Sequence, residues 1–138
     1  MSTLRATLAA AGIKRRPRQV HEYEETAFQK RCVGVLEDLQ KIRRDFTFNA
    51  VNPVPAKGKA ARGLAKGMGA RAGWVDLEII FRGRFIGFEL KKRGEKAREN
   101  QRTMHTEITL AGGTVFTTDT DKAFFEALVV IGLAQVGR

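Results

Sequence analysis

The sequence predicts an α/β domain, because helical and strand-like periodicities alternate along one chain of 138 residues. Three observations carry this prediction. Apolar residues recur at helical spacing between residues 22 and 42, two β-branched and aromatic runs flank a short turn at Arg82-Gly83, and a second amphipathic stretch spans residues 99–111. A chain of this length is expected to form one domain that can bury a proper core.

The charge of the chain is high for a globular protein. Its 25 Lys and Arg residues outnumber 15 Asp and Glu residues, which gives a net charge of +10. This excess favours a polyanionic partner, either nucleic acid or an acidic membrane surface. The longest apolar run, residues 127–134, is far shorter than the ~20 residues that a membrane-spanning helix needs. A basic cluster follows the apolar patch at residues 9–13 instead of preceding it, so a signal peptide is not expected.

The cysteine count bears on the compartment and on metal binding. Cys32 is the only cysteine, so neither an internal disulfide nor a cysteine-rich zinc site can form within the chain. We therefore expect a reducing, cytoplasmic compartment, in a bacterial or phage-infected cell.

The first twenty residues are predicted to be a flexible basic arm, because residues 14–18 hold four cations and no acid. Such an arm is either a solvated tail or a segment that contacts phosphates or serves as a targeting signal. Residues 21–138 are predicted to form the folded domain.

A first helix is predicted from Glu22 to about Ile42. Its apolar stripe is spaced by three and four residues and consists of Phe28, Cys32, Val35, Leu39 and Ile42. Extending the stripe back by three residues reaches Glu25, whose carboxylate would then point toward the body of the protein. Acids in the first turn of a helix also stabilise its positive end, which is a sufficient reason for Glu22 and Glu24. For Glu25 both interpretations stay open.

A strand is predicted at residues 46–51, followed by a mobile basic loop at residues 53–72. The loop contains four glycines and no acid, and it is too long to be a mere connector. It is either a binding element for a phosphate backbone or a disordered insertion. The predicted phosphate contacts lie in this loop and in the connector that follows the next two strands: Lys57, Lys59, Arg62, Lys66, Arg71, Lys92, Arg93, Lys96 and Arg98.

The two apolar runs around Arg82-Gly83 predict a β-hairpin with a two-residue turn. In the register in which Phe81 faces Arg84, Asp76 faces Glu89. Alternation along each strand then gives a core face, made of Leu77, Ile79, Phe81, Ile86, Phe88 and Leu90. The other face carries Asp76, Glu78, Gly87, Glu89 and Lys91.

Two carboxylates that face each other across a pair of strands repel one another. A divalent cation between Asp76 and Glu89 would turn this repulsion into binding, since hard cations such as Mg²⁺ take carboxylate and carbonyl oxygens. The alternative is an edge hairpin whose solvated face carries mixed charges.

A second helix, from Glu99 to Ala111, carries Met104, Ile108 and Ala111 on one stripe. Three residues before Met104 stands Gln101, a polar residue at the end of a buried stripe, as Glu25 is in the first helix. Each of these two residues could simply be a buried polar group with its hydrogen bonds satisfied.

Glycines at 112 and 113 are expected to end the second helix, and residues 114–118 are predicted to form a strand. Asp119 or Thr120 could cap a last helix that runs to about Gln135. This helix is apolar nearly all round, which a terminal helix of a small domain cannot bury alone. Self-association is therefore predicted there.

Asp76 followed by Glu89-Leu90-Lys91, in this order of elements, resembles the PD-(D/E)XK nuclease superfamily and, within it, the VRR-NUC family. The likeness covers residues 22–119. The motifs that carry it are Gly73-x-x-Asp76-Leu77, the run from Gly83 to Lys91, Glu99-Asn100-Gln101, and Glu25-x-x-x-Gln29. Members of the family commonly have proline immediately before the aspartate, where this chain has Val75.

The resemblance implies a restriction-endonuclease-like αβββαβ core, in which helices flank a mixed central sheet, here with an extra C-terminal helix. It implies a metal-dependent DNA endonuclease that hydrolyses phosphodiester bonds with Mg²⁺ or Mn²⁺. Stand-alone members look like dimeric enzymes acting on branched DNA, similar to Holliday-junction resolvases. The expected partners are therefore DNA, with a preference for branched or junction forms, and a second copy of the chain, which would bind through the C-terminal helix.

The resemblance also implies roles for single residues. Asp76, Glu89 and the backbone carbonyl of Leu90 would hold the metal ion, with Glu25 as a further ligand. Lys91 would orient or deprotonate the attacking water, and Gln101 would position Lys91 or a water.

Two other classes of protein stay open. A non-catalytic nucleic-acid-binding protein would suit the net charge, but carboxylates on its phosphate-binding face would repel the ligand. A dimeric regulatory module would suit the apolar last helix but not the basic loop.

Overall fold

The computed structural model describes residues 17–51 and 58–137, with side chains from residue 24 onward. The described part of the chain has four helices and one four-stranded sheet, which confirms the predicted mixed α/β class. The elements are α2 (Pro17–Ile42), β1 (Phe46–Ala50), α3 (Lys59–Gly67), β2 (Leu77–Phe81), β3 (Arg84–Leu90), α4 (Glu99–Leu110), β4 (Thr114–Thr118) and α5 (Asp121–Val130). None of these four helices combines the length and apolarity that crossing a bilayer requires.

The sheet has the strand order β1-β2-β3-β4. The first three strands are antiparallel, while β4 runs parallel to β3, a pairing that needs a crossover and receives it from α4. The hairpin pairs Phe81 with Arg84 and Leu77 with Phe88, which confirms the predicted register. Arg82 and Gly83 both have positive φ, 49° and 77°, as a tight primed turn requires.

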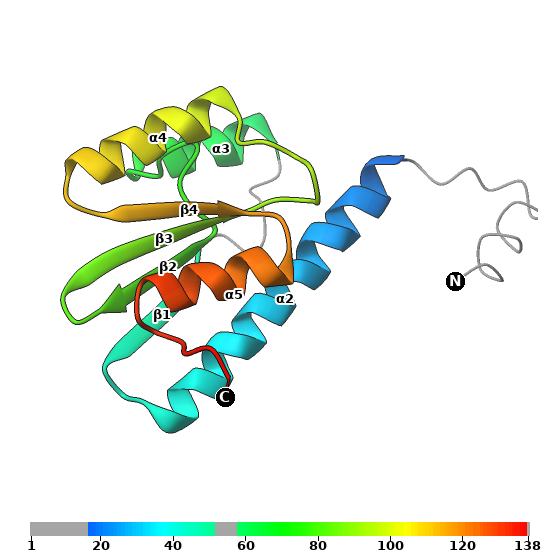
Figure 1. Ribbon diagram of the computed structural model, residues 1–138. Helices are drawn as coiled ribbons and strands as arrows, with labels where there is room; N and C mark the ends of the chain where they lie inside the picture. The colour runs from blue at the N-terminus through cyan, green and yellow to red at the C-terminus, as the bar shows by residue number, and fades with distance from the viewer. Residues whose placement is uncertain (1–16, 52–57, 138) are drawn as a thin grey trace, which may run out of the picture.

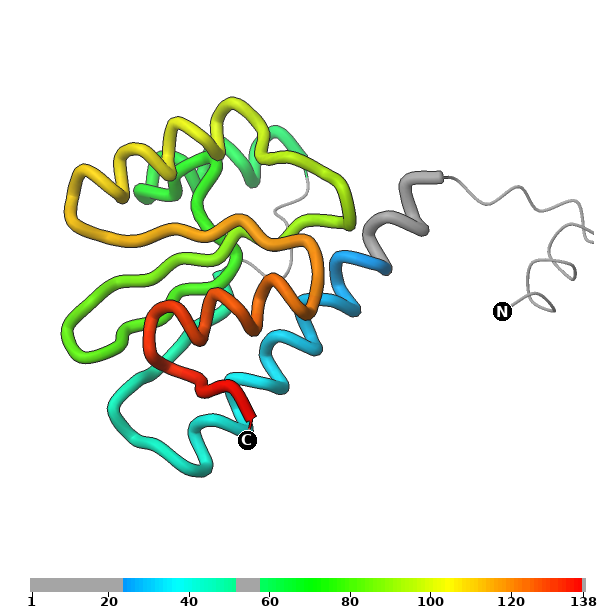
Figure 2. The backbone as a smooth tube through the Cα atoms, in the orientation of Figure 1, coloured from blue at the N-terminus to red at the C-terminus, as the bar shows by residue number. Residues whose placement is uncertain are grey.

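Helices cover both faces of the sheet (Figure 1). The tube in Figure 2 shows α2 and α5 on one face and α3 and α4 on the other. The main core lies on the α2–α5 face, where all six residues of the predicted core face of the hairpin are buried. A smaller cluster lies under α4 and contains Val75, Met104 and Ile108. Val75 packs over Gly87 so closely that a Cβ at Gly87 would lie 2.8 Å from Val75 Cγ1.

The first helix begins earlier than predicted and buries a partly different set of side chains. Pro17 begins α2, so the arm expected at residues 1–20 is wrong for its last four residues, and residues 1–16 lie outside the described chain. The side chains that enter the core are spaced by four residues, Phe28, Cys32 and Leu36. Ile42, predicted to be buried, lies off that line at the end of the helix and is 81% exposed.

Part of the predicted basic loop is helical. Residues 59–67 form α3, although none of its side chains is buried. Three alanines and a leucine give this segment a good helix propensity, which the absence of a buried stripe concealed. The predicted contact Lys57 lies outside the described residues.

The later elements agree closely with the sequence, except at the C-terminus. The strands β1 and β4 and the helix α4 lie where they were predicted, and Thr120 caps α5 by accepting a hydrogen bond from the Ala123 N–H at 3.1 Å. However, α5 ends at Val130 instead of Gln135. Past Gly132 (φ 87°) the chain turns back, and Leu133, which is 1% exposed, completes the core. The apolar character predicted to need a partner is therefore largely satisfied within the chain.

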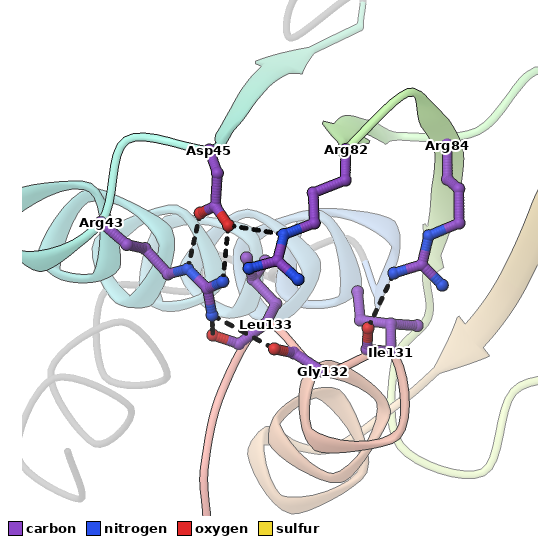
Figure 3. Close-up of polar contacts among 7 residues, drawn as sticks. All are labelled: Arg43, Asp45, Arg82, Arg84, Ile131, Gly132 and Leu133. Carbon is purple, nitrogen blue, oxygen red and sulfur yellow. Dashed lines mark hydrogen bonds and ion pairs between the residues drawn. The ribbon is translucent and has the colours of Figure 1, made fainter.

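Charged side chains fasten this C-terminal segment to the hairpin turn (Figure 3). Arg43 pairs with Asp45 through Nε–Oδ1 at 2.7 Å and Nη2–Oδ2 at 2.8 Å, and Arg82 Nε reaches the same carboxylate at 2.9 Å. Arg43 Nη1 and Arg84 Nη2 donate at 2.9 to 3.1 Å to the carbonyl oxygens that follow α5, those of Ile131, Gly132 and Leu133. This end of the hairpin is thus occupied by structural contacts, and the opposite end carries the predicted site.

Candidate active site

The predicted site residues meet where β2 begins and β3 ends. Asp76 immediately precedes β2, Glu89 lies near the end of β3, and Lys91 follows it. Alternation directs Glu89 and Lys91 to the α4 face of the sheet, where Glu89 is 2% and Lys91 4% exposed. Buried charged side chains are rare unless they are paired or functional, so this cluster is the strongest candidate site in the described chain.

Asp76 and Glu89, which were predicted to face each other, are not one of the residue pairs between β2 and β3. The ladder ends at the pair Leu77–Phe88, and the Asp76 N–H donates to the Phe88 carbonyl at 2.9 Å. The two carboxyl groups nevertheless lie close enough for a direct interaction that affects the pKa of each. Asp76 Oδ2 also accepts the Leu90 N–H at 2.7 Å, which fixes its position against the end of β3.

Gln101 holds one oxygen of the Glu89 carboxylate. Its Nε2 donates to Glu89 Oε1 at 2.7 Å, while its own Oε1 accepts the Arg98 N–H at 2.7 Å, so Gln101 is anchored at both ends. Lys91 Nζ lies 3.8 Å from the same Oε1. The structure thus places Gln101 against Glu89 and not against Lys91, which was one of the two partners, Lys91 or a water, expected from the resemblance.

His105 approaches the other oxygen and was not singled out in the sequence. Its Nε2 lies 3.7 Å from Glu89 Oε2, and both atoms are buried without a hydrogen-bond partner. The signal that could have found it is the helical period, since His105 stands four residues after Gln101 and therefore on the same face of α4.

Burial sets the protonation of this cluster. It raises the pKa of Glu89 to about 8, and the nearby charge of Asp76 adds to the shift. Burial also raises the pKa of Asp76, although the Leu90 N–H bond works in the opposite direction. Burial, together with the charge of Lys91, lowers the pKa of His105. Near neutral pH, therefore, Glu89 is largely protonated, and burial disfavours the charged form of the imidazole.

Glu25 reaches the edge of this cluster from α2. Its pKa is raised by burial and then by Glu95, with which it shares a hydrogen bond, while the charge of Lys91 lowers it. Asp76 is close enough to add a small repulsion. Glu95 lies in the connector after β3, where no periodicity distinguishes it from its neighbours, so it was not predicted as a site residue.

A groove of about 960 Å³ lies between α3 and α4, and its lining includes Glu99 and Glu107 as well as three cations. Arg62, Lys66 and Arg71 line it, and Arg71 Nη2 forms an ion pair with Glu107 Oε2 at 2.7 Å. Asn100, the neighbour of Gln101, belongs to the same lining, so the groove lies along the helix that orients Glu89. A second hollow of about 460 Å³ reaches Lys91 from the side of α2 and is bordered by Lys92 and Arg93. The remaining predicted contacts, Lys59, Lys96 and Arg98, are exposed.

The donor atoms suit a divalent cation. Two carboxyl groups with raised pKa values lie together, and Glu89 Oε2 is a buried acceptor that nothing satisfies. Within residues 17–51 and 58–137 no three His, Cys, Asp or Glu side chains stand ready as a complete metal-binding group. A cation at this point would therefore need a backbone oxygen or water to complete its ligands.

Comparison of the chain with protein-family models, curated proteins and solved structures found no match. The assignment of a function therefore depends on the chemistry of the residues themselves.

Gly73 sets the position of α4 over the site and gives a test of the packing. It has a φ of 80°, and a Cβ there would collide with the Asn100 carbonyl oxygen and lie 2.9 Å from the Gln101 backbone nitrogen. Gly73→Ala should therefore lower the free energy of unfolding by about 2–5 kcal/mol, from the strained φ and the collision together. Chemical denaturation would measure it.

Gly94 provides the matched control for this substitution. It has the same φ of 80° but nothing within 4 Å of an added Cβ, so Gly94→Ala should cost only about 1 kcal/mol. Equal losses in the two variants would show that Gly73 does not support α4 by close packing.

Proposed function

We propose that this chain is a metal-dependent DNA endonuclease that resembles the VRR-NUC family of PD-(D/E)XK nucleases. The observation that carries the proposal is the pair of carboxyl groups, the half-buried Asp76 and the buried Glu89, with Lys91 beside them and a groove bordered by three cations alongside. The order α2-β1-β2-β3-α4-β4, with an antiparallel hairpin and a parallel fourth strand, is compatible with a restriction-endonuclease-like core.

Asp76, Glu89 and the Leu90 carbonyl would hold Mg²⁺ or Mn²⁺, with Glu25 as a further ligand. When bound, such a cation acidifies a water and neutralises charge on the phosphoryl group. Glu89, whose pKa is raised to about 8, must give up its proton before it can act as a ligand, so activity should increase as pH rises toward 8.

The neighbours of the carboxylates have separate tasks. Gln101 keeps Glu89 in one orientation through the bond to Oε1. Lys91 Nζ, 3.8 Å from that oxygen, would orient or deprotonate the attacking water and offset negative charge that develops on the phosphate.

Phosphate contacts would come from the cations around the two hollows. Arg62, Lys66 and Arg71 border the groove, Lys92 and Arg93 border the second hollow, and the exposed Lys96 and Arg98 lie in the connector after β3. No element that reads base edges is visible in the described chain, so recognition of DNA shape, and of branched DNA in particular, is the expected mode. The expected place of action is a reducing, cytoplasmic compartment.

The proposed homodimer would use a smaller surface than the sequence indicated. Leu133 belongs to the core, whereas Phe125 and Val130 of α5 remain 40% and 77% exposed. These two side chains, with the exposed Ile42 of α2, are the apolar groups that a second copy could cover.

A non-catalytic nucleic-acid-binding protein is the second candidate. The cations that border the groove favour this candidate as much as they favour a nuclease. It leaves the carboxyl pair of Asp76 and Glu89 without a role.

A cleavage panel separates the two candidates. Single-stranded, duplex, flap and four-way DNA should be incubated with the protein in Mg²⁺, in Mn²⁺ and in excess EDTA. Metal-dependent cutting, strongest on a branched substrate, is the expected result. Binding without cutting in any metal would favour the second candidate, and cutting that persists in EDTA would remove the metal from the mechanism.

A further inference from the structure

Two buried polar atoms of the site face each other without partners. Glu89 Oε1 is satisfied by Gln101, but Glu89 Oε2 and His105 Nε2 make no hydrogen bond although both are buried. An unpaired buried polar group is destabilising. Two such atoms that face each other define a place where one bridging group would satisfy both.

The distance between them is informative. At 3.7 Å, Glu89 Oε2 and His105 Nε2 are too far apart for a good hydrogen bond. Two ligands that each stand about 2.1 Å from one metal ion are about 3.0 Å apart at the 90° angle of an octahedral ion and about 3.7 Å apart at roughly 125°. A shared octahedral cation would therefore draw the two atoms together by about 0.7 Å from the observed 3.7 Å.

The chemistry of the two atoms limits which cation this is. A carboxylate oxygen binds Mg²⁺ and Mn²⁺ alike, whereas an imidazole nitrogen favours first-row transition metals and contributes little to Mg²⁺. Because His105 lies one turn after Gln101 on α4, the helix that orients Glu89 also presents the nitrogen. Water can fill the remaining positions of an octahedral ion, so two side-chain donors with Asp76 nearby suffice.

We propose that His105 is a nitrogen ligand of the cation at this site and that it makes the site select Mn²⁺ over Mg²⁺. This inference rests on the proposed function for the presence of a metal. It assigns a residue and a metal preference that the paired carboxylates alone do not give.

The test measures the metal without DNA. The Mn²⁺ complex of the full chain should be examined by pulsed electron paramagnetic resonance, in a buffer free of amines and imidazole, for coupling to a directly bound nitrogen. The affinities for Mn²⁺ and Mg²⁺ should be measured by calorimetry for the wild type, for His105→Gln, whose amide oxygen offers a hard donor, and for Thr106→Ala, an exposed control on α4.

The wild type should show nitrogen coupling that His105→Gln lacks. The ratio of Mn²⁺ to Mg²⁺ affinity should fall by at least about tenfold in His105→Gln and stay unchanged in Thr106→Ala. A wild-type complex without nitrogen coupling, a ratio unaffected by His105→Gln, or no binding of Mn²⁺ would overturn the inference.

Failure of this inference is distinguishable from failure of the proposed function. Cleavage with Mg²⁺ but no nitrogen coupling would leave the nuclease standing and remove His105 from the metal. Nitrogen coupling without cleavage of any DNA would keep His105 as a ligand and remove the nuclease.

Discussion

Glu89→Gln should abolish metal-dependent DNA cleavage, with a loss of at least about 10³-fold in the single-turnover rate. An amide is a neutral and much weaker metal ligand than a carboxylate, while its size and polarity let it stay beside Gln101 and His105. DNA affinity, measured by fluorescence anisotropy, should be unchanged or slightly higher, because a negative charge near the phosphate is lost. Lys91→Ala should show the same separation of binding from cutting.

Glu126→Gln is the matched control for the loss of a carboxylate. Glu126 lies on α5 with its side chain 64% exposed and contacts only Lys122, at 3.9 Å, among the ion pairs of the described chain. This variant should cut DNA at the wild-type rate. If Glu89→Gln cut as fast as Glu126→Gln, the carboxyl pair would not be the catalytic centre.

The metal-free protein should lose stability as pH rises from about 6.5 to 8. The folded-state pKa of Glu89, about 8, lies above its ordinary value of 4.5, so between these values the folded state binds more protons than the unfolded state. Stability therefore falls with pH throughout that window and becomes level above pH 8. The change between pH 6.5 and 8 should be on the order of 1–2 kcal/mol in the free energy of unfolding.

The range above pH 6.5 isolates this effect. The pKa of His105 is lowered from 6.5, so its contribution to stability decreases only as pH falls below 6.5. In that lower range its effect on stability is opposite in sign to the effect of Glu89. Denaturant titrations in EDTA at pH 6.5 and 8 would measure the change. Glu89→Gln should be level across this range, and saturating Mn²⁺ should restore stability at pH 8. Equal slopes for the wild type and Glu89→Gln would show that Glu89 is not the group that titrates.

The same physics explains why the site costs stability and is nevertheless retained. Neutral Gln in place of Glu89 should make the metal-free protein more stable at pH 8, since no charge is then buried. A variant that folds better and cuts worse is the expected sign of a functional group, because selection for stability alone would have removed the carboxylate.

Much of the site could be predicted because its geometry is local. The two-residue turn at Arg82-Gly83 set the pairing of β2 with β3, and alternation along those strands then placed Glu89 and Lys91 on one face. Gln101 followed from the helical period of α4. These predictions depend only on residues that are close in sequence or lie on directly paired strands. The amino-acid sequence is sufficient to predict such short-range relations.

The features that the sequence did not predict correctly depend on contacts between segments that are distant in the chain. Whether α5 continues past Val130 depended on the main core, which accepts Leu133 only if the chain turns back at Gly132. Glu95 became a member of the site because the connector packs beside α2, which no periodicity of its own segment records, and the helical period places His105 on the face of Gln101 without showing which oxygen of Glu89 it approaches.

By itself the sequence determined the hairpin, its two faces and the carboxylates that one of those faces carries, because backbone pairing and side-chain alternation are local properties of the chain. The tertiary structure alone decided how deeply these carboxylates are buried, which donors reach each oxygen of Glu89, and that Glu89 Oε2 and His105 Nε2 are left facing each other. Burial and long-range contacts are properties of the packed whole, and it is they that shift the pKa values on which the proposed chemistry depends.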